Sequence, residues 1–438
     1  MAINRRQVLA GGLGLASAVG LSACSGLTSK AGSSAPSGGG SAGGPVELTF
    51  VNWSGDEEKA AFDAVIAAFQ QANPGITIKT DTVPYASVQT NLDTRFQANN
   101  PPDLFRVSYI DMGQYTSQDV LLDLTASLDA NAFEPGLFSA VVANGKAYGA
   151  PHQIDTTAIL YRKDAFEAAG ITNVPTTLAE AWTWEQFTDA ANKLAKVTKN
   201  SQLPFIYDWQ SAGAYRWLTW LFEAGGALLG PDLKSAAIDS DAGRKALDFT
   251  TGFFRNGWVA KNSSVKSTTY PDAAFQSGTV AMAFAGSFLV PSINRGVKQK
   301  FEYGAMPQPR DVAASTDLGG NAVVAPKSGK NTEAATKFLQ YLVSEDAMRT
   351  YCQATNQLPT LKSLTASQLD FAIRPDLMAP FVLQATTLTP EQVAQVTVPQ
   401  FADLNLALQN ELEKSFLGGR SSAETASALA EAVQKAVR

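Results

Sequence analysis

Residues 45–75 read PVELTFVNWSGDEEKAAFDAVIAAFQQANPG. The first part, 45–53, alternates apolar and polar residues and then becomes continuously apolar, which predicts a β-strand. Apolar residues then recur at helical spacing: Phe62, Val65, Ile66 and Phe69. Ser54 or Asp56 would cap this helix at its start, and Pro74-Gly75 would end it. The stretch therefore predicts a strand that leads directly into a helix.

The same alternation continues outward from this stretch. Residues 76–84 (ITIKTDTVP) predict a second strand, 87–99 (SVQTNLDTRFQAN) a second helix and 103–108 (DLFRVS) a third strand. Alternating strands and helices favour an α/β fold, a largely parallel sheet with helices on both faces. Ligands of such sheets bind beyond the carboxyl ends of the strands. Trp53-Ser54 and Ser108-Tyr109-Ile110-Asp111 stand at two of these ends.

The N-terminal residues have the layout of an export signal. Arg5 and Arg6 are followed by a short, glycine-rich apolar run that is too short for a membrane span of about 20 residues. The paired arginines resemble the twin-arginine export motif, and Leu21-Ser22-Ala23-Cys24 resembles a bacterial lipobox. We therefore interpret 1–23 as a signal peptide that is removed, and Cys24 as the lipidated first residue of the mature chain.

Residues 24–44 are predicted to be a flexible tether, because they consist mostly of Gly, Ser, Ala, Pro and Thr. A lipidated cysteine anchors a protein to a membrane without crossing it. The expected location is the extracytoplasmic face of the cell membrane.

Composition excludes several classes of function. The chain has 34 basic and 40 acidic residues, so it lacks the basic surface that nucleic acids require. His152 is the only histidine, which excludes a metal site of clustered histidines, and no cofactor is expected. We expect His152 to be a loop residue with an ordinary hydrogen bond, and Cys352, the only cysteine besides Cys24, to be a buried free thiol. From Cys24 onward 415 residues remain (438 minus 23), which favours two domains.

Five blocks in order carry a resemblance to a known family. They are 101–125 (PPDLFRVSYIDMGQYTSQDVLLDLT), 145–171 (GKAYGAPHQIDTTAILYRKDAFEAAGI), 182–194 (WTWEQFTDAANKL), 273–288 (AAFQSGTVAMAFAGSF), and 303–309 (YGAMPQP) with the segment from LGGN at 318 to LPT at 360. Together they resemble family 1 extracellular solute-binding proteins, the sugar-binding components of ABC importers related to maltose-binding protein. The resemblance runs from about Leu48 to the C-terminus.

The resemblance implies a two-lobe periplasmic-binding-protein-like fold of class II, with a mostly parallel sheet in each lobe and a ligand cleft between the lobes. Lobe one would comprise 45–154 and 307–344, and lobe two 155–306 and 345–438, with hinge closure around the ligand. It implies a monomeric binding protein, not an enzyme, that captures a sugar or oligosaccharide and delivers it to the permease subunits of an ABC transporter.

The resemblance also implies the ligand contacts. On the first lobe they would be Trp53, Ser54, Ser108, Tyr109 and Asp111, with Asp155 at the hinge. On the second lobe they would be Asp208, Trp209, Gln210, Trp217, Gly286, Ser287 and Phe288, and a third wall would comprise Gly319, Gly320 and Asn321. The family often has tryptophan where this chain has Phe288. Four other tryptophans lie in helix-like apolar patterns and are expected to be structural: Trp182, Trp184, Trp220 and Trp258.

Other functions stay open at this point. A secreted glycoside hydrolase would use two carboxylates about 5 to 10 Å apart, and Asp111 with Asp155 or Asp208 could be such a pair. A surface adhesin would explain the anchor but not the ordered blocks. A binding protein for a non-sugar solute, such as a peptide or a polyamine, is the remaining alternative.

Overall fold

The computed structural model describes residues 44–198, 202–210, 213–365 and 368–438. The predicted signal peptide (1–23), Cys24 and all of the predicted tether except Gly44 lie outside the described residues. Within the described ranges, no helix combines the length and apolar character needed to cross a membrane.

The opening stretch folds as the sequence predicts, except at the helix cap. Strand β1 spans Val46–Asn52 and helix α1 spans Asp56–Ala72. The cap residue is Gly55, whose backbone N–H donates to Glu58 Oε2 at 3.3 Å, and neither Ser54 nor Asp56 caps the helix. Ser54 is occupied elsewhere, because its hydroxyl donates to Asn52 Oδ1 at 2.8 Å.

The first sheet has the strand order β2-β1-β3-β11-β6. Its other strands are β2 (Ile76–Thr82), β3 (Leu104–Ser108), β6 (Ala150–Gln153) and β11 (Asn321–Val324). β1 pairs in parallel with β2 and β3, whereas β11 pairs antiparallel with β3 and β6. Asp103 has the structural role of fixing the start of β3, since its carboxylate accepts from Thr49 N at 2.9 Å and Asn331 Nδ2 at 3.1 Å.

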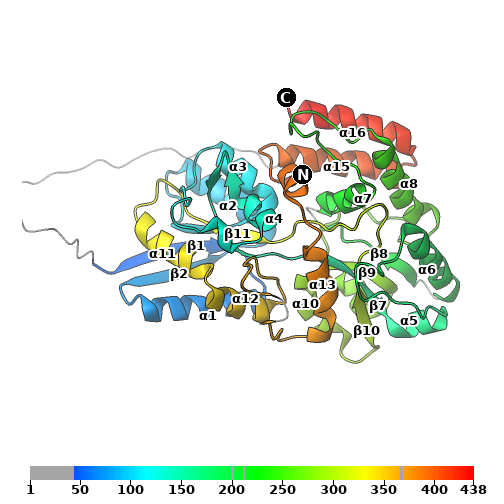
Figure 1. The fold of residues 1–438 in the computed structure, drawn as a ribbon, viewed down its shortest axis with the longest axis horizontal. Helices are drawn as coiled ribbons and strands as arrows, with labels where there is room; N and C mark the ends of the chain where they lie inside the picture. The colour runs from blue at the N-terminus through cyan, green and yellow to red at the C-terminus, as the bar shows by residue number, and fades with distance from the viewer. Residues whose placement is uncertain (1–43, 199–201, 211–212, 366–367) are drawn as a thin grey trace, which may run out of the picture. The chain divides into compact units, whose positions relative to one another are not determined.

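Helices from distant parts of the chain gather around this sheet (Figure 1). They are α1, α2 (Tyr85–Gln97), α3 (Met112–Ser117), α4 (Pro135–Phe138), α11 (Thr332–Leu342) and α12 (Glu345–Thr355). Short 3-10 turns lie at η1 (Tyr109–Asp111), η2 (Ala130–Ala132) and η3 (Ser139–Val141), and β4 (Val142–Ala143) pairs with β5 (Lys146–Ala147). Helix α14 (Pro390–Val396) packs on α4 and η3. Buried phenylalanines join the layers, with the rings of Phe50 and Phe62 5.3 Å apart.

The second sheet has the order β10-β7-β9-β8. Its strands are β7 (Thr157–Arg162), β8 (Leu203–Ile206), β9 (Val280–Gly286) and β10 (Tyr303–Met306). Only β8 and β9 pair in parallel; β7 pairs antiparallel with both β9 and β10. This sheet therefore departs from the mostly parallel arrangement expected, because β7 enters directly from the first sheet and β10 leads back to it.

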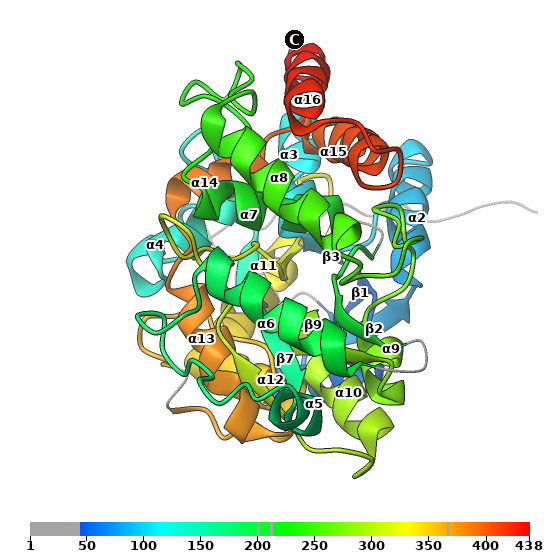
Figure 2. The ribbon, with the colours of Figure 1, turned by 90° about the vertical axis from the view of Figure 1, so that its right-hand side faces the viewer.

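Helices from the middle and the end of the chain gather around the second sheet (Figure 2). They are α5 (Lys163–Ala168), α6 (Trp184–Val197), α7 (Leu218–Glu223), α8 (Asp241–Arg255), α9 (Asp272–Ser277), α10 (Val290–Val297), α13 (Met378–Ala385), α15 (Phe401–Phe416) and α16 (Ser422–Ala436), with 3-10 turns η4 (Gly213–Trp217), η5 (Ser287–Leu289) and η7 (Pro375–Leu377). The four tryptophans expected to be structural, Trp182, Trp184, Trp220 and Trp258, are all buried, which confirms that prediction.

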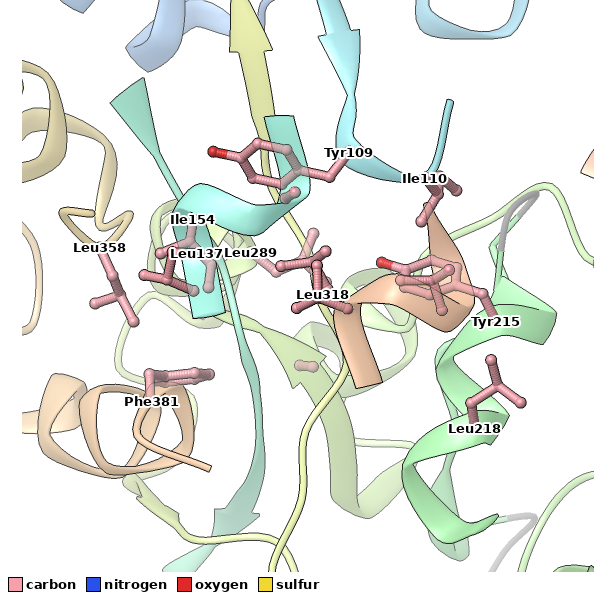
Figure 3. Packing of buried hydrophobic residues seen from close by; sticks show 14 of the residues in the cluster. Tyr109, Ile110, Leu137, Ile154, Tyr215, Leu218, Leu289, Leu318, Leu358 and Phe381 are labelled. Atoms are coloured by element: carbon pink, nitrogen blue, oxygen red, sulfur yellow. The ribbon is translucent and has the colours of Figure 1, made fainter. Parts of the chain in front are cut away.

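The chain passes between the two sheets at 154–156 and at 307–320, near the predicted positions Asp155 and Pro307. The crossings are tied together: Gly319 N donates to Asp155 O at 3.1 Å, and Thr157 Oγ1 donates to Asp317 Oδ1 at 2.5 Å. Apolar side chains from both crossings and from the helices beside them pack together, including Ile154, Leu318, Leu358 and Phe381 (Figure 3).

The environment of His152 differs from the expectation. It lies in β6, not in a loop, and is fully buried between the rings of Phe62 (5.6 Å) and Tyr351 (5.0 Å). Among the described residues neither ring nitrogen has a side-chain hydrogen-bond partner. Burial, assisted by the Arg106 guanidinium, lowers its pKa to about 3, so the ring is neutral. Cys352 is a buried free thiol, as predicted, and burial raises its pKa.

Candidate functional site

A cavity of about 730 Å³ lies between elements of the two sheets. Its first side is formed beyond the carboxyl ends of β1, β2 and β3 and by the start of α1. The second side is formed by the region around η4, by Tyr270 and by the segment from Phe288 to Arg295. The crossings at Asp155 and at 318–321 close the space between them. The cavity therefore lies where the strand-end rule predicts a ligand site.

Each side carries a pair of partly exposed aromatic rings. On the first wall, which we define by Trp53, Tyr85 and Arg106, the rings of Trp53 and Tyr85 meet edge to face with centroids 5.2 Å apart. On the second wall, defined by Tyr270, Phe288 and Arg216, the rings of Tyr270 and Phe288 meet in the same way at 5.4 Å. These four rings are only partly buried, so each wall presents an apolar face to a ligand.

An ion pair between two side chains of the protein supports the first wall. Arg106 Nη2 lies 2.6 Å from Glu58 Oε1, and its Nη1 donates to the backbone oxygen of Trp53 at 2.5 Å. The guanidinium also lies 4.6 Å from the centre of the Trp53 ring. Glu58 accepts further hydrogen bonds from Gln357 Nε2 at 2.9 Å and Tyr351 Oη at 3.2 Å. Burial alone would raise the pKa of Glu58, but Arg106 and these hydrogen bonds lower it, so the pair stays charged.

The second wall contains a cation shared by two carboxylates. Arg216 Nε lies 3.7 Å from Asp208 Oδ2 and 3.4 Å from Asp317 Oδ2, and all three side chains are buried. Asp317 also accepts from Tyr215 Oη at 3.3 Å. Burial raises the pKa of Asp208 to about 6, although Arg216 opposes this shift.

Asp155 lies at the crossing and lines the cavity. Its side chain is 7% exposed, and among the described residues no donor hydrogen-bonds its carboxylate. A Cβ atom at position 319 would lie 2.1 Å from Asp155 Oδ1, so only glycine allows the two crossings to approach this closely. Burial, and next the Asp317 carboxylate, raise the pKa of Asp155 to about 7.

Ten of the sixteen residues that the sequence predicted as ligand contacts line this cavity. They are Trp53, Ser54, Ser108, Tyr109, Asp155, Gln210, Phe288, Gly319, Gly320 and Asn321. The other six, which are Asp111, Asp208, Trp209, Trp217, Gly286 and Ser287, do not line it.

The two tryptophans are excluded from the cavity by core packing. Trp217 is fully buried, and its Nε1 donates to Thr250 Oγ1 at 3.0 Å. Trp209 is 3% exposed and packs against Tyr207 and Phe416, with ring centroids at 4.2 and 5.6 Å.

The four remaining residues lie outside the lining of the cavity. Asp208 is the buried partner of Arg216, whereas Asp111 is partly exposed, and desolvation raises its pKa to about 6. A Cβ atom at Gly286 would lie 2.3 Å from the ring of Phe288, so glycine lets that ring fold back over the strand end. Ser287 is buried, and its backbone N–H donates to Thr156 O at 3.0 Å.

Sequence reasoning missed several residues that line the cavity, above all Tyr85, Arg106, Arg216 and Tyr270. The sequence contains a feature that could have identified two of these residues. Arg106 is a charged residue inside the buried strand β3, and Tyr85 follows the carboxyl end of β2 closely. Tyr270 lies in a loop, and nothing in its local sequence indicates a ligand-binding residue.

No group of histidine, cysteine, aspartate and glutamate side chains suited to a metal ion occurs within the described part of the chain.

The family model and the relatives that match this chain are all solute-binding proteins. The family model described as bacterial extracellular solute-binding protein matches residues 52–349. A maltooligosaccharide ABC transporter solute-binding lipoprotein of Streptococcus pneumoniae is 24% identical over 318 residues, which are 69% of this chain and 69% of the relative. A maltodextrin-binding protein of Bacillus subtilis is 24% identical over 316 residues, 70% of each chain.

A solved structure shows the same fold. It is an ABC transporter solute-binding protein from Thermotoga lettingae bound with α-D-tagatose, which aligns with a TM-score of 0.74 at 25% identity and covers 90% of this chain and 100% of that chain.

Proposed function

Because the chain belongs to the bacterial extracellular solute-binding protein family, we propose that it captures a sugar or oligosaccharide in the cavity between its lobes and delivers it to an ABC transporter permease. We propose that it acts as a monomer, without a cofactor and without catalysing a reaction.

One observation carries this proposal: a pair of partly exposed aromatic rings on each wall of a single cavity. Sugar rings have flat apolar faces and hydroxyl-rich edges, so their sites combine aromatic platforms with a few polar groups. The polar groups are present beside the rings, including Ser108, Gln210 and Asn321. The names of the relatives, which bind maltooligosaccharides and maltodextrin, point to the same class of solute.

The hydrolase alternative has less support. The carboxylate pairs considered for it combine Asp111 with Asp155 or with Asp208, and neither Asp111 nor Asp208 lines the cavity. A pair of catalytic carboxyl groups must flank the reacting bond from within the site.

Calorimetric titration with maltotriose, maltose and D-tagatose tests the proposal. A binding protein should bind at least one of them and return it chemically unchanged after prolonged incubation. Conversion of the sugar would favour the hydrolase, and a failure of these sugars and a wider carbohydrate library to bind would contradict the sugar-binding proposal.

We further propose that the mature chain begins at a lipidated Cys24 and is held on the extracytoplasmic face of the membrane. The lipobox-like sequence before a tether-like segment supports this anchor. Cys24→Ala should move the protein from the membrane fraction to the soluble fraction, and persistence in the membrane fraction would contradict the anchor.

The domain boundaries are likewise proposals: 45–154 with 307–344 for one lobe, and 155–306 with 345–438 for the other. The packing of α12 against α1 favours extending the first lobe to include this helix, because the rings of Tyr351 and Phe62 lie 4.7 Å apart. Ligand should close the lobes, which would lower the radius of gyration measured by X-ray scattering in solution.

A further inference from the structure

More carboxyl groups than guanidinium groups line the cavity. Five carboxyl groups line it: Asp56, Glu57, Glu58, Asp155 and Asp272. Three guanidinium groups line it: Arg106, Arg216 and Arg295. A ligand that carries charge would therefore meet a surface with an excess of acid.

Each of these three guanidinium groups is already paired within the protein. Arg106 pairs with Glu58, Arg295 pairs with Glu57, and Arg216 lies between Asp208 and Asp317. A negatively charged ligand would have to compete with these carboxylates for a cation, and near Arg216 it would meet two of them. The lining therefore disfavours an anionic ligand.

Among the described residues, three of the lining carboxyl groups, Asp56, Asp155 and Asp272, have no ion-pair partner, and only Asp155 of these three is buried. It is more than nine-tenths buried, it lines the cavity, and no donor among the described residues hydrogen-bonds its carboxylate. A buried carboxylate without a partner is costly, and it is relieved either by a proton or by a cation. The pKa of about 7 reflects this cost, since burial and Asp317 both raise it.

We propose that the cavity prefers saccharides that carry a basic nitrogen, such as amino sugars, over their neutral and acidic counterparts, and that Asp155 is the counter-ion of that nitrogen. This inference rests on the proposed sugar-binding function. An ammonium group supplies the charge-assisted donor that Asp155 lacks, which is stronger than a hydroxyl donor. A carboxylate on the sugar would be repelled by Asp155 and would find each lining guanidinium beside at least one carboxylate of the protein.

The test uses matched sets of sugars in calorimetry near neutral pH. The sets are glucose, glucosamine and glucuronic acid; galactose, galactosamine and galacturonic acid; and cellobiose, chitosan disaccharide and cellobiouronic acid. Within a set that binds, we expect the amino member to bind about tenfold more tightly than the neutral member, and the acidic member most weakly.

Two variants test whether Asp155 causes the preference for the amino sugar. Asp155→Asn keeps the shape of the side chain and should bind the amino and neutral members equally. Asp63→Asn is the matched control, because it removes the same charge from an exposed position on α1 outside the lining, where Asp63 pairs with Lys59 at 2.6 Å. This control should keep the wild-type ranking.

The outcomes separate the two proposals. If a neutral or an acidic member binds as tightly as the amino member, or if Asp155→Asn keeps the preference, the inference is overturned while sugar binding stands. If none of the nine sugars and no member of the wider carbohydrate library binds, the proposed function fails and the inference fails with it. The ranking within wild-type protein decides the question even if Asp155→Asn does not fold.

Discussion

The two walls of the cavity carry similar aromatic pairs but manage their charges differently. On the first wall Arg106 meets one carboxylate, Glu58, at 2.6 Å, and the pair is internally neutral. On the second wall Arg216 is shared by Asp208 and Asp317 at longer distances, and Asp155 adds a further carboxyl group nearby. The charges of the first arrangement balance without a ligand, whereas the second arrangement has an excess of negative charge.

This difference suggests a division of roles. A buried ion pair with no net charge mainly holds its own wall in place, and breaking it should affect stability. An unbalanced group of carboxyl groups gains from an added positive charge or proton, so changing it should affect ligand choice and pH dependence. The predictions below test this division, beginning with the largest expected effect.

Arg106→Ala should lower the free energy of unfolding by about 3 to 5 kcal/mol, because it leaves the mostly buried Glu58 side chain, which is 20% exposed, without its cation. Lys337→Ala is a suitable control, since it also removes one positive charge but from an exposed pair with Glu333, for which the expected loss is about 0 to 1 kcal/mol. Chemical denaturation measures both variants. Equal losses would show that the first wall does not depend on its ion pair.

Trp53→Ala should weaken sugar binding by about 1 to 3 kcal/mol, because it removes the larger stacking platform of the first wall. This corresponds to about one to two decades in the dissociation constant. Phe288→Ala should act in the same direction on the second wall, with a smaller effect because its ring is smaller.

Trp209→Ala should instead lower the free energy of unfolding, since that ring is packed in the core of the second lobe. Calorimetry together with denaturation distinguishes these results, and a binding loss confined to Trp209→Ala would reverse our assignment.

The sequence was informative where a local pattern has a local cause. The alternation of apolar residues predicted β1 and α1 to within a few residues, and the strand-end rule placed Trp53, Ser108 and Tyr109 at the cavity. The contact proposed for Trp209 came from the family resemblance, and the structure packs this ring against Tyr207 and Phe416. The local sequence around a tryptophan is the same whether its ring turns into the core or into the cleft.

Features that depend on distant packing were also out of reach of the sequence. The ion pair of Arg106 with Glu58 joins β3 to α1, and the sharing of Arg216 by two carboxylates joins η4 to a crossing more than 100 residues away. The burial of His152 depends on Phe62 and Tyr351, which come from α1 and α12. Pairings of this kind have no signature in any short window of sequence.

Stability should fall as pH rises from 5 to 8, by about 1 to 3 kcal/mol through Asp155. The pKa of this carboxyl group is about 7 in the folded protein against an ordinary value of 3.8. The folded protein therefore holds a proton that the unfolded chain has lost, and the stability from this proton is complete below about 3.8 and disappears as pH passes 7. The charged groups around Asp155 are the carboxylates of Asp317 and Glu58 and the guanidinium groups of Arg216 and Arg106.

Denaturation of wild type and Asp155→Asn at both pH values measures this contribution. The variant has no proton to lose at this position, so its stability should change less between pH 5 and pH 8. Identical changes in the two proteins would assign the pH dependence to other groups, for example Asp208 and Asp111, whose pKa values are each raised to about 6.

The smallest effect is expected from the pair that connects the two sides of the cavity. Arg295 on α10 pairs with Glu57 on α1, and both residues line the cavity. The pair can form only when the lobes are close together, so it should favour the closed, ligand-bound state.

Arg295→Gln should therefore weaken sugar binding, but by only about 0.2 to 1 kcal/mol, because the side chains are 55% and 27% exposed and water screens their attraction. The loss should be larger at low salt than at high salt, since ions in solution screen exposed charges. Arg374→Gln is the control, because Arg374 pairs with Asp376 within the second lobe at 2.7 Å and lies outside the lining of the cavity. Calorimetry of both variants at two salt concentrations measures the difference. A salt-independent loss in Arg295→Gln would mean that Arg295 acts on the sugar itself and not through the contact between the lobes. The charged groups of the first and second walls would then have more similar roles than their ion pairs suggest.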